Sequence, residues 1–304
     1  MKILHYALGF PPYRTGGMTK FCIDLLLQQV RDGHQTALLW PGQMGMFRRK
    51  VEIKDRGITR LEPDWIGVHN YEVINPLPVS YDEGITKFDA YMKDGGREAY
   101  SELLETYQPD VVHVHTLMGI HRSFLEETKK RKIRLVFTAH DFFPICPKVT
   151  MFRQGAICSS VLSCNDCGKC NTTALSIKKI CLLQSPFYRE IKNSAFVRKL
   201  RKRHRDKYLS ENAEDGREES VEDGENYKKL RAFYDSYLQL MDMVHYNSTI
   251  TKAVYESVFM LPNSCVIGIT HGDMSDHRRR RDYSRTGLRI RYLGPLGGAK
   301  GFFC

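Results

Sequence analysis

The order of short apolar runs and helical patterns constrains this chain more than any other feature. An apolar run at residues 2–9 ends in a Gly-Phe-Pro-Pro loop, and the pair Gly16-Gly17 opens a segment, residues 18–30, with the i, i+3, i+4 spacing of an amphipathic helix. Residues 35–40 form a second apolar run. A strand, a helix and a strand in this order make one βαβ unit, whose crossover joins parallel strands.

The same alternation returns later in the chain. A helical segment at residues 96–107 precedes the apolar run at 111–115, and a second at 121–131 precedes the run at 133–139. Residues 51–90 are rich in β-branched residues, Pro and Gly, and predict strands and loops without a clear order. Alternation of this kind predicts the α/β class, with a Rossmann-like, doubly wound parallel sheet.

Residues 243–247 and 265–270 add two more predicted strands. We therefore expect one Rossmann-like domain over residues 1–285. It is interrupted by an insertion at about residues 146–241, which is rich in cysteine at first and then helical.

The composition is that of a globular protein, 42% hydrophobic and 27% charged. No apolar run reaches the ~18 residues that span a bilayer, and the N-terminal run is too short for a secretory signal, so we expect a cytoplasmic location. The net charge of +11 is uneven, because residues 198–207 and 278–304 are basic and residues 214–225 are acidic. Such runs usually form solvated surface, and anionic lipid or an anionic substrate is the main alternative.

Glycines and polar residues follow three of the predicted strands. Gly16 and Gly17 come after the first strand, His115 ends a second, and His140 and Asp141 follow a third. Ligands of open α/β sheets bind at the carboxyl ends of the strands, and a glycine loop before a helix presents N–H groups to an anion. A glycine pair or a histidine alone usually has a structural role, but together at one edge these residues favour a binding site.

Five segments carry a pattern known from one family. They are GGMTKFCIDLLLQQVRDGHQTALL, PDVVHVHTLMGI, VFTAHDFFPICP, the NST-led helix that ends at YESV, and RIRYLGPLGGAKGF. In this order they resemble the family 4 glycosyltransferases of the GT-B fold. The resemblance implies two Rossmann-like domains with the active site between them, the N-terminal one for the acceptor and the C-terminal one for the nucleotide-sugar donor. It also implies hexosyl transfer with retention at the anomeric carbon.

The resemblance also implies roles for residues of the first domain. Gly16 and Gly17 correspond to the loop that approaches the donor phosphates and the transferred sugar. His115 corresponds to the histidine that faces that sugar, with His113 as the alternative. His140 and Asp141 correspond to the loop that borders the cleft. The candidate catalytic residues are therefore His115, His140 and Asp141.

One further residue would belong to the donor side. Lys300 corresponds to the lysine whose charge meets the donor diphosphate, so it joins the two glycines as a candidate donor-binding residue. A fixed cation and backbone N–H groups stabilise the negative charge of a leaving nucleoside diphosphate, so no catalytic metal is expected.

Two departures from the family pattern concern the second domain. Gly294-Pro295 stand where many members have Gly-Arg, and the two glutamates spaced as E-x7-E, which hold the donor, do not follow Lys300. We therefore expect residues 286–304 to be the first strand and glycine turn of a truncated donor-binding domain, and the chain to be inactive alone. A frameshift and a split gene both remain open as the cause.

Five of the nine cysteines lie in one window: Cys146, Cys158, Cys164, Cys167 and Cys170. Disulfides are not expected in a chain without a signal peptide, whereas four thiolates suit a tetrahedral Zn²⁺. A similar-looking sub-group of these transferases implies structural zinc on Cys146, Cys158, Cys164 and Cys167, with Cys170 able to replace one of them. An iron–sulfur cluster would lack its fourth cysteine, since Ala174 stands there, and free thiols are the other alternative.

The sequence thus favours a glycosyltransferase that moves a sugar from a nucleotide-sugar to a polysaccharide or lipid-linked acceptor, with peripheral contact to the anionic inner face of a membrane. The alternative is a zinc-stapled basic module that binds nucleic acid or anionic membrane without catalysis. The basic run at residues 198–207 has no interleaved aromatic residues to stack on bases, and no nucleic-acid fold signature occurs. Nucleic acid is therefore the less favoured partner.

Overall fold

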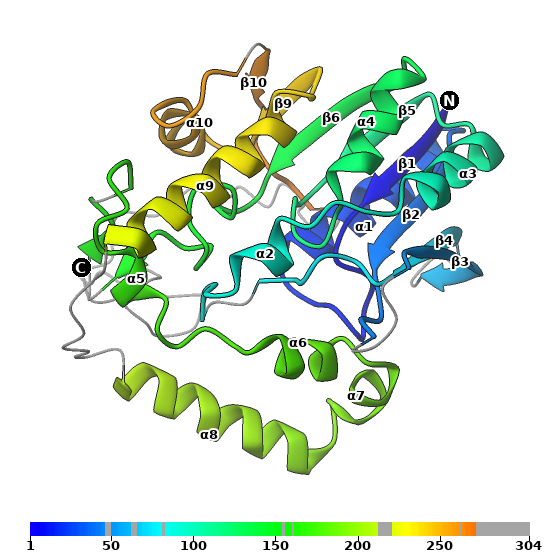
Figure 1. Ribbon diagram of the computed structural model, residues 1–304. Coiled ribbons are helices and arrows are strands. Elements are labelled where there is room, and N and C mark those ends of the chain that lie inside the picture. The colour runs from blue at the N-terminus through cyan, green and yellow to red at the C-terminus, as the bar shows by residue number, and fades with distance from the viewer. Residues whose placement is uncertain are drawn as a thin grey trace, which may run out of the picture.

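Figure 1 presents a computed structural model of the chain, which describes residues 1–45, 50–61, 66–80, 83–153, 156–159, 161–211, 221–261 and 263–271. The predicted domain boundary at residue 285, the strand and glycine turn at residues 286–304, and Lys300 lie outside the described residues.

The described strands form an eight-stranded sheet in the order β10-β9-β6-β5-β1-β2-β4-β3. Their bounds are β1 (Lys2–Tyr6), β2 (Gln35–Pro41), β3 (Glu52–Leu61), β4 (Ile66–Ile74), β5 (Val111–Val114), β6 (Arg134–Ala139), β9 (Met243–Tyr246) and β10 (Ser264–Val266). Neighbouring strands run parallel, except that β3 is antiparallel to β4. The predicted α/β class with a Rossmann-like, mainly parallel sheet is confirmed.

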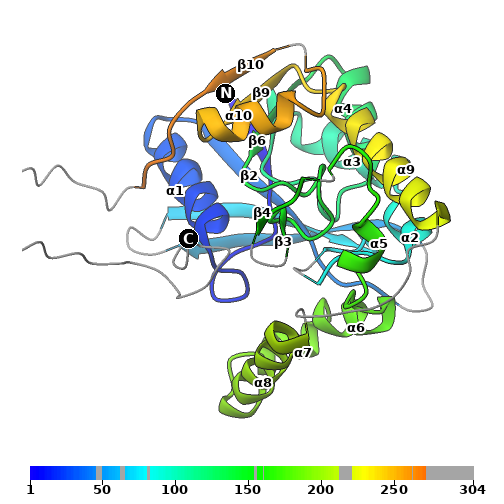
Figure 2. The same ribbon diagram turned by 90° about the vertical axis from the view of Figure 1, so that its left-hand side faces the viewer.

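Helices cover both faces of the sheet (Figure 2). Helix α1 (Gly17–Arg31) lies on one side, and α3 (Arg97–Tyr107), α4 (Arg122–Lys130) and α9 (Val221–Leu238) lie on the other. The shorter α2 (Phe88–Tyr91) precedes α3, and α10 (Thr249–Glu256) follows β9. Residues buried at helical spacing on α1, such as Cys22, Leu26 and Leu27, explain why this segment folds as a helix against the sheet.

The core is split by the sheet into a large and a small cluster. The large cluster includes Phe124 of α4 together with Tyr234 and Tyr237 of α9, all fully buried. The small one lies beneath α1 and includes Leu26 and Leu38. Burying a side chain of this size contributes ~1.5–3 kcal/mol, so α9 is held firmly to the sheet.

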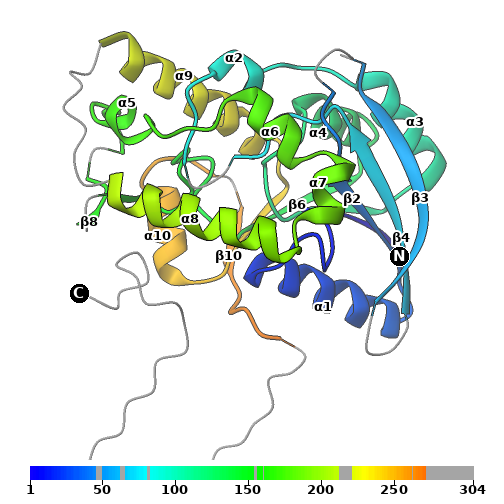
Figure 3. The same cartoon turned by 90° about the horizontal axis from the view of Figure 1, so that it is seen from below.

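The predicted insertion at residues 146–241 therefore contains one helix of the doubly wound core, since α9 is the crossover helix between β6 and β9. Its other elements are β7 (Phe152–Arg153), β8 (Ala156–Ile157), α5 (Cys167–Cys170), α6 (Ile177–Leu183), α7 (Pro186–Ile191) and α8 (Ala195–Glu211). Figures 1 and 3 show α6, α7 and α8 following one another along one side of the molecule. None of the helices in the described ranges is long and apolar enough to cross a membrane.

A buried carboxylate ties α7 to the sheet. Glu72 of β4 is fully buried, and its Oε1 accepts a hydrogen bond from the Gln43 N–H at 3.1 Å and one from Arg189 of α7 at 2.6 Å. Arg56 of β3 pairs with its other oxygen. The Arg189 guanidinium also lies 4.9 Å from the centre of the Trp40 ring. A buried carboxylate without its cations would cost free energy of folding, so this network fixes the position of α7 beside the sheet.

Candidate functional site

The order of the strands reverses at β1. The chain runs outward from β1 to β2 on one side and later returns to β5 on the other, and β1 pairs in parallel with both strands. At such a reversal the loops after the two strands turn to opposite faces and leave a crevice that binds ligands. The candidate site therefore lies in the loops that follow β1, β5 and β6.

The glycine pair forms the entry to α1. Gly16 has φ 121° and ψ 171°, a conformation that residues with side chains rarely adopt, and the helix begins at Gly17. A Cβ atom added at either glycine would meet no atom of the described structure within 4 Å, and no side chain of that part of the chain caps the helix. The N–H groups at the start of a helix have no partner within the helix, so those of Gly17, Met18 and Thr19 can bind an anion.

The structure brings His115 and His140 together beneath α1. Nε2 of His140 lies 3.2 Å from Nδ1 of His115, and Nε2 of His115 lies 3.0 Å from Nδ1 of His5 on β1. Nε2 of His5 lies 2.7 Å from Oε1 of Gln29 on α1. The Phe21 ring, in the first turns of α1, lies 5.0 Å from the ring of His140 and 5.9 Å from that of His115, centroid to centroid. We call Gln29, His5, His115 and His140 the Gln29 chain.

His113, the alternative to His115, belongs to a second row of hydrogen bonds. Its Nε2 lies 2.7 Å from Oγ1 of Thr138, which lies 3.0 Å from Nδ1 of His245 on β9. Nε2 of His245 lies 2.8 Å from the backbone oxygen of Ile267. We call these four residues the carbonyl chain.

Burial holds the imidazoles of His5, His113, His115 and His140 in their neutral form. Desolvation lowers the pKa of His5 and of His140 to about 4. Desolvation and then repulsion from neighbouring histidines hold the pKa of His113 and of His115 well below the ordinary value. Near pH 7 each ring therefore has one N–H donor and one acceptor nitrogen. Such rings suit sugar hydroxyl groups and supply no positive charge to a diphosphate.

Three histidines have a spacing that would suit a metal ion. Among the described residues, His5, His113 and His115 are the one group whose ligand atoms all lie within 4.8 Å of one another. Both ring nitrogens of His5 are already hydrogen-bonded, to Gln29 and to His115. A metal would have to displace one of these partners, so hydrogen bonding accounts better for the arrangement.

Asp141 shapes the loop after β6. Its Oδ1 accepts a hydrogen bond from the Phe143 N–H at 3.0 Å, and its backbone oxygen accepts one from the Tyr255 hydroxyl at 2.7 Å. These bonds hold the loop in which His140 points back to His115.

The five cysteines of the sequence window gather beside this loop. Cys146, Cys158, Cys167 and Cys170 line a small cavity of about 30 Å³ that Arg231 of α9 also reaches. Cys164 is hydrogen-bonded to Cys167, and this bond lowers the pKa of the Cys164 thiol, whereas burial raises that of Cys146 to about 11. The structure therefore joins the cysteines of α5 to the loop that carries His140.

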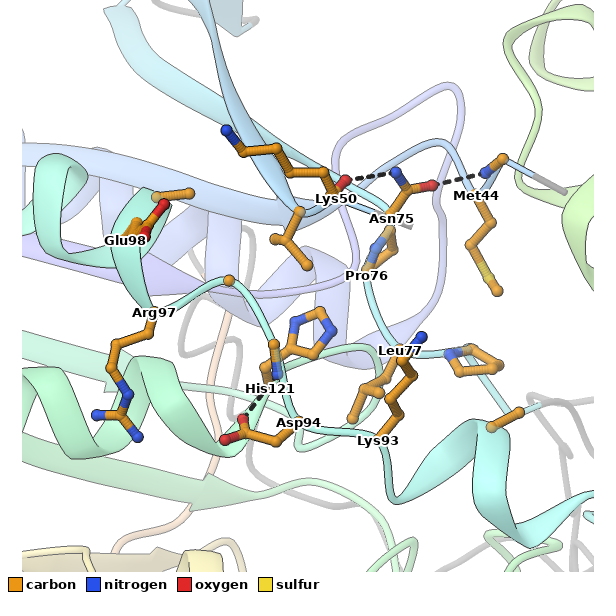
Figure 4. Close-up of a pocket in the computed structure, with 17 residues that line it drawn as sticks. Met44, Lys50, Asn75, Pro76, Leu77, Lys93, Asp94, Arg97, Glu98 and His121 are labelled. Carbon is orange, nitrogen blue, oxygen red and sulfur yellow. Dashed lines mark hydrogen bonds between the residues drawn. The ribbon is translucent and has the colours of Figure 1, made fainter. Parts of the chain in front are cut away.

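A larger cavity, of about 460 Å³, opens at the same edge of the sheet (Figure 4). Its walls come from the loops after β2 and β4 and from the linker between α2 and α3, and its polar residues include Lys50, Asn75, Lys93, Asp94, Arg97 and His121. Asn75, at φ 56°, accepts a hydrogen bond from the Gly45 N–H at 2.8 Å and donates one to the Lys50 backbone oxygen at 2.6 Å. Two amines, a guanidinium, an imidazole and the carboxylates of Asp94 and Glu98 thus surround one space.

This cavity, together with Gln29 and His5, was not predicted from the sequence. A local signal was present in the pair Gly95-Gly96. Gly96 has φ 77°, and a Cβ atom there would lie 2.6 Å from Val51 and 2.9 Å from Tyr100. The pair allows the α2–α3 linker to pass close to the sheet and to form one wall of the cavity.

Comparison with known proteins gives one family. Residues 15–157 match the family model described as Glycosyltransferase Family 4. The matched segment contains the glycine loop, His115, His140, Asp141 and Cys146, the first cysteine of the window. The resemblance inferred from the motifs is confirmed by this match. No curated protein matches the chain.

Three solved structures are similar at low identity. A sucrose-phosphate synthase from Thermosynechococcus elongatus is 10% identical, with a TM-score of 0.39, over 88% of this chain and 47% of that one. A UDP-forming trehalose-phosphate synthase from Burkholderia xenovorans is 12% identical, with a TM-score of 0.34, over 84% and 42%. The catalytic domain of starch synthase IV from Arabidopsis thaliana is 17% identical, with a TM-score of 0.27, over 46% and 34%. The chain spans less than half of each structure.

We predict that the protein loses stability as the pH falls through the range in which these histidines would titrate in the unfolded chain. The pKa of His5 and of His140 is about 4 in the folded protein and near 6.5 when unfolded. Between these two pKa values the unfolded chain binds more protons than the folded protein. The free energy of unfolding therefore has its full value above about pH 7 and decreases as the pH drops toward 4.

Urea unfolding at a series of pH values checks this, and the range from about pH 6.5 to 5 separates histidines from most carboxyl groups. His140→Asn should make the free energy of unfolding depend less on pH, whereas His34→Asn, outside the cluster, should leave this pH dependence unchanged. A free energy that stays constant across this range in the unaltered protein would contradict the prediction.

Proposed function

Because residues 15–157 match the family 4 glycosyltransferase model, we propose that this chain contains the acceptor-side half of an enzyme that moves a sugar from a nucleotide-sugar to a saccharide or lipid-linked acceptor. The observation that carries the proposal is the meeting of the glycine loop, His115 and His140 at the reversal of strand order. In this proposal the enzyme works at the cytoplasmic side of a membrane.

Each part of the site supports one step of such a transfer. The N-terminus of α1 offers N–H groups to the donor phosphates, where a leaving diphosphate gains negative charge. The neutral rings of His115 and His140 suit the hydroxyl groups of the transferred sugar. The cavity beside Lys50 and Lys93 is large enough for a sugar ring and has two amines for an anionic acceptor.

The proposal includes a second, donor-binding half. The described residues form one eight-stranded sheet with its helices and the small sheet β7-β8, and Lys300, the cation inferred to meet the diphosphate, lies outside them. Neutral histidines cannot replace that charge. We therefore propose that the described sheet and its helices bind the acceptor and that fast transfer needs a donor-binding half.

We predict that residues 1–304 bind saccharides at the Lys50 cavity. Binding of short oligosaccharides and of a short-chain prenyl diphosphate saccharide would be measured by NMR saturation transfer and titration. The double variant Lys50→Ala/Lys93→Ala should weaken binding of the diphosphate compound about tenfold or more, since each lost charged hydrogen bond costs about 1 kcal/mol or more. Lys252→Ala, at an exposed pair on α10, is the matched control.

Two results would count against the proposal. Failure of every saccharide to bind, combined with tight and sequence-selective nucleic-acid binding at physiological salt, would favour the basic binding module. Turnover of a nucleotide-sugar by residues 1–304 at 1 per second or faster, a rate typical of complete enzymes, would refute the need for a second half but not the transferase.

We also propose that the cysteine window holds a structural zinc ion. Zinc prefers four thiolates, and five cysteines lie around or beside the small cavity. Their sulfur atoms are not yet close enough together in the described structure to hold an ion, so binding would draw them inward. Arg231 would offset the negative charge of four thiolates on one ion. Since the Cys146 N–H donates to the Phe142 oxygen at 2.7 Å, zinc on Cys146 would brace the loop that carries His140.

The zinc proposal predicts one zinc per chain, measured by elemental analysis of protein purified without added metal. Cys167→Ser should remove most of it, whereas Cys265→Ser, on β10, should not. Separate Cys164→Ser and Cys170→Ser variants identify the fourth ligand. A brown protein with iron would indicate a cluster, and a protein without metal would leave free thiols.

The insertion helices support the membrane contact. Phe187 and Phe196 are 66% and 71% exposed, and basic residues of α8, such as Arg198 and Lys199, follow directly. Apolar side chains among cations suit an anionic bilayer surface, where each Lys or Arg contributes about 1 kcal/mol.

Vesicle flotation tests this contact. The protein should float with vesicles that contain phosphatidylglycerol and not with pure phosphatidylcholine, and Phe196→Ser should reduce flotation. Met260→Ser, which alters a residue 90% exposed elsewhere, is the control. Equal flotation with both kinds of vesicle, or with neither, would refute the membrane contact.

A further inference from the structure

The Gln29 chain joins helix α1 to the edge of the site through three histidine rings. Each link runs from Nε2 of one ring to the next group inward: His140 Nε2 to His115 Nδ1, His115 Nε2 to His5 Nδ1, and His5 Nε2 to Gln29 Oε1. His5 is fully buried and His115 is 1% exposed, so solvent does not compete for these bonds.

A chain of neutral imidazoles has a direction. Each ring has one N–H donor and one acceptor nitrogen. The nitrogen that carries the proton on one ring therefore determines which nitrogen carries it on the next ring. Because Oε1 of Gln29 can only accept, His5 must carry its proton on Nε2 and accept at Nδ1. His115 then donates from Nε2 and accepts at Nδ1, and His140 donates from Nε2.

The carbonyl chain has the same direction for a different reason. It ends on the backbone oxygen of Ile267, which can only accept, so His245 carries its proton on Nε2 and accepts from the Thr138 hydroxyl. Thr138 then accepts from Nε2 of His113. A backbone oxygen cannot be exchanged for a donor, whereas a glutamine amide can turn over and present its NH₂ group.

We propose that Gln29 is a positioning residue that holds His5, His115 and His140 as Nε2–H tautomers, which leaves Nδ1 of His140 as a hydrogen-bond acceptor at the carboxyl edge of the sheet. If the amide were reversed, every ring of the chain would reverse and His140 would donate from Nδ1. Within the described residues, no hydrogen bond to Nδ1 of His140 is found. In the transferase proposed above, on which this last step rests, that nitrogen accepts a hydrogen bond from a sugar hydroxyl.

Nitrogen NMR of protein labelled with ¹⁵N-histidine tests the tautomers without any substrate, near pH 7.5. Protonated and unprotonated ring nitrogens have well-separated shifts, and single His→Asn variants assign the signals. We expect the Nε2–H pattern for His5, His115 and His140. An Nδ1–H pattern at His140 in the unaltered protein would overturn the proposal.

Two variants of Gln29 test its role. In Gln29→Glu the ionised carboxylate can only accept, so the Nε2–H pattern should persist. In Gln29→Leu the acceptor is lost, and the Nδ1–H form of His140 should become dominant. In the original direction the N–H group at Nε2 of His5 would have no partner, whereas in the reversed direction only a lone pair of that nitrogen would be unpaired. An unchanged tautomer in Gln29→Leu would overturn the role of Gln29.

The carbonyl chain is the internal control. His113 and His245 should keep the Nε2–H pattern in both Gln29 variants, which shows that the fold is intact. Addition of an oligosaccharide provides a separate outcome: a shift at Nδ1 of His140 supports the proposed function. Its absence would count against that function while the tautomer result stands.

Discussion

The reversal of strand order at β1 is the constraint on which the rest of the structure depends. With β2 on one side and β5 on the other, β1 places its own carboxyl end between two loops that turn to opposite faces. Helix α1 consequently lies over β1 and β2, where His5 points toward it. The glycine loop, the two hydrogen-bonded chains and the loop after β6 all take their positions from this one topological step.

The sequence was sufficient for the features that depend on local periodicity. A strand that ends at His115 and another that precedes His140 are recognisable from apolar runs, and parallel strands bring such ends to one edge. The distance of 3.2 Å between Nε2 of His140 and Nδ1 of His115 follows from the adjacency of β5 and β6 in the sheet. Strands that follow one another in the chain are usually neighbours in space. Gly16 is recognisable because a helix begins directly after it.

Features that depend on long-range packing could not be predicted in this way. His5 lies in the middle of an apolar strand, and Gln29 has the spacing of a polar helix residue, so neither differs from ordinary sequence until the rotation of α1 over the sheet is known. The 460 Å³ cavity combines loops after β2 and β4 with a linker before α3. Glu72, fully buried in β4, is satisfied by arginines from β3 and α7, a pairing that no sequence spacing reveals.

The pairing of Glu72 with Arg189 has a mechanical consequence. Arg189 is held by the carboxylate and lies against Trp40, so α7 cannot rotate independently of the strands β2 and β4. Helix α8 begins a few residues after α7, so the same contacts set where α8 starts. The strands β2 and β4 lead into the loops that line the cavity around Asn75. Because this buried ion pair ties α7 to β4, a surface that binds α7 and α8 would also set the direction in which the mouth of the cavity faces.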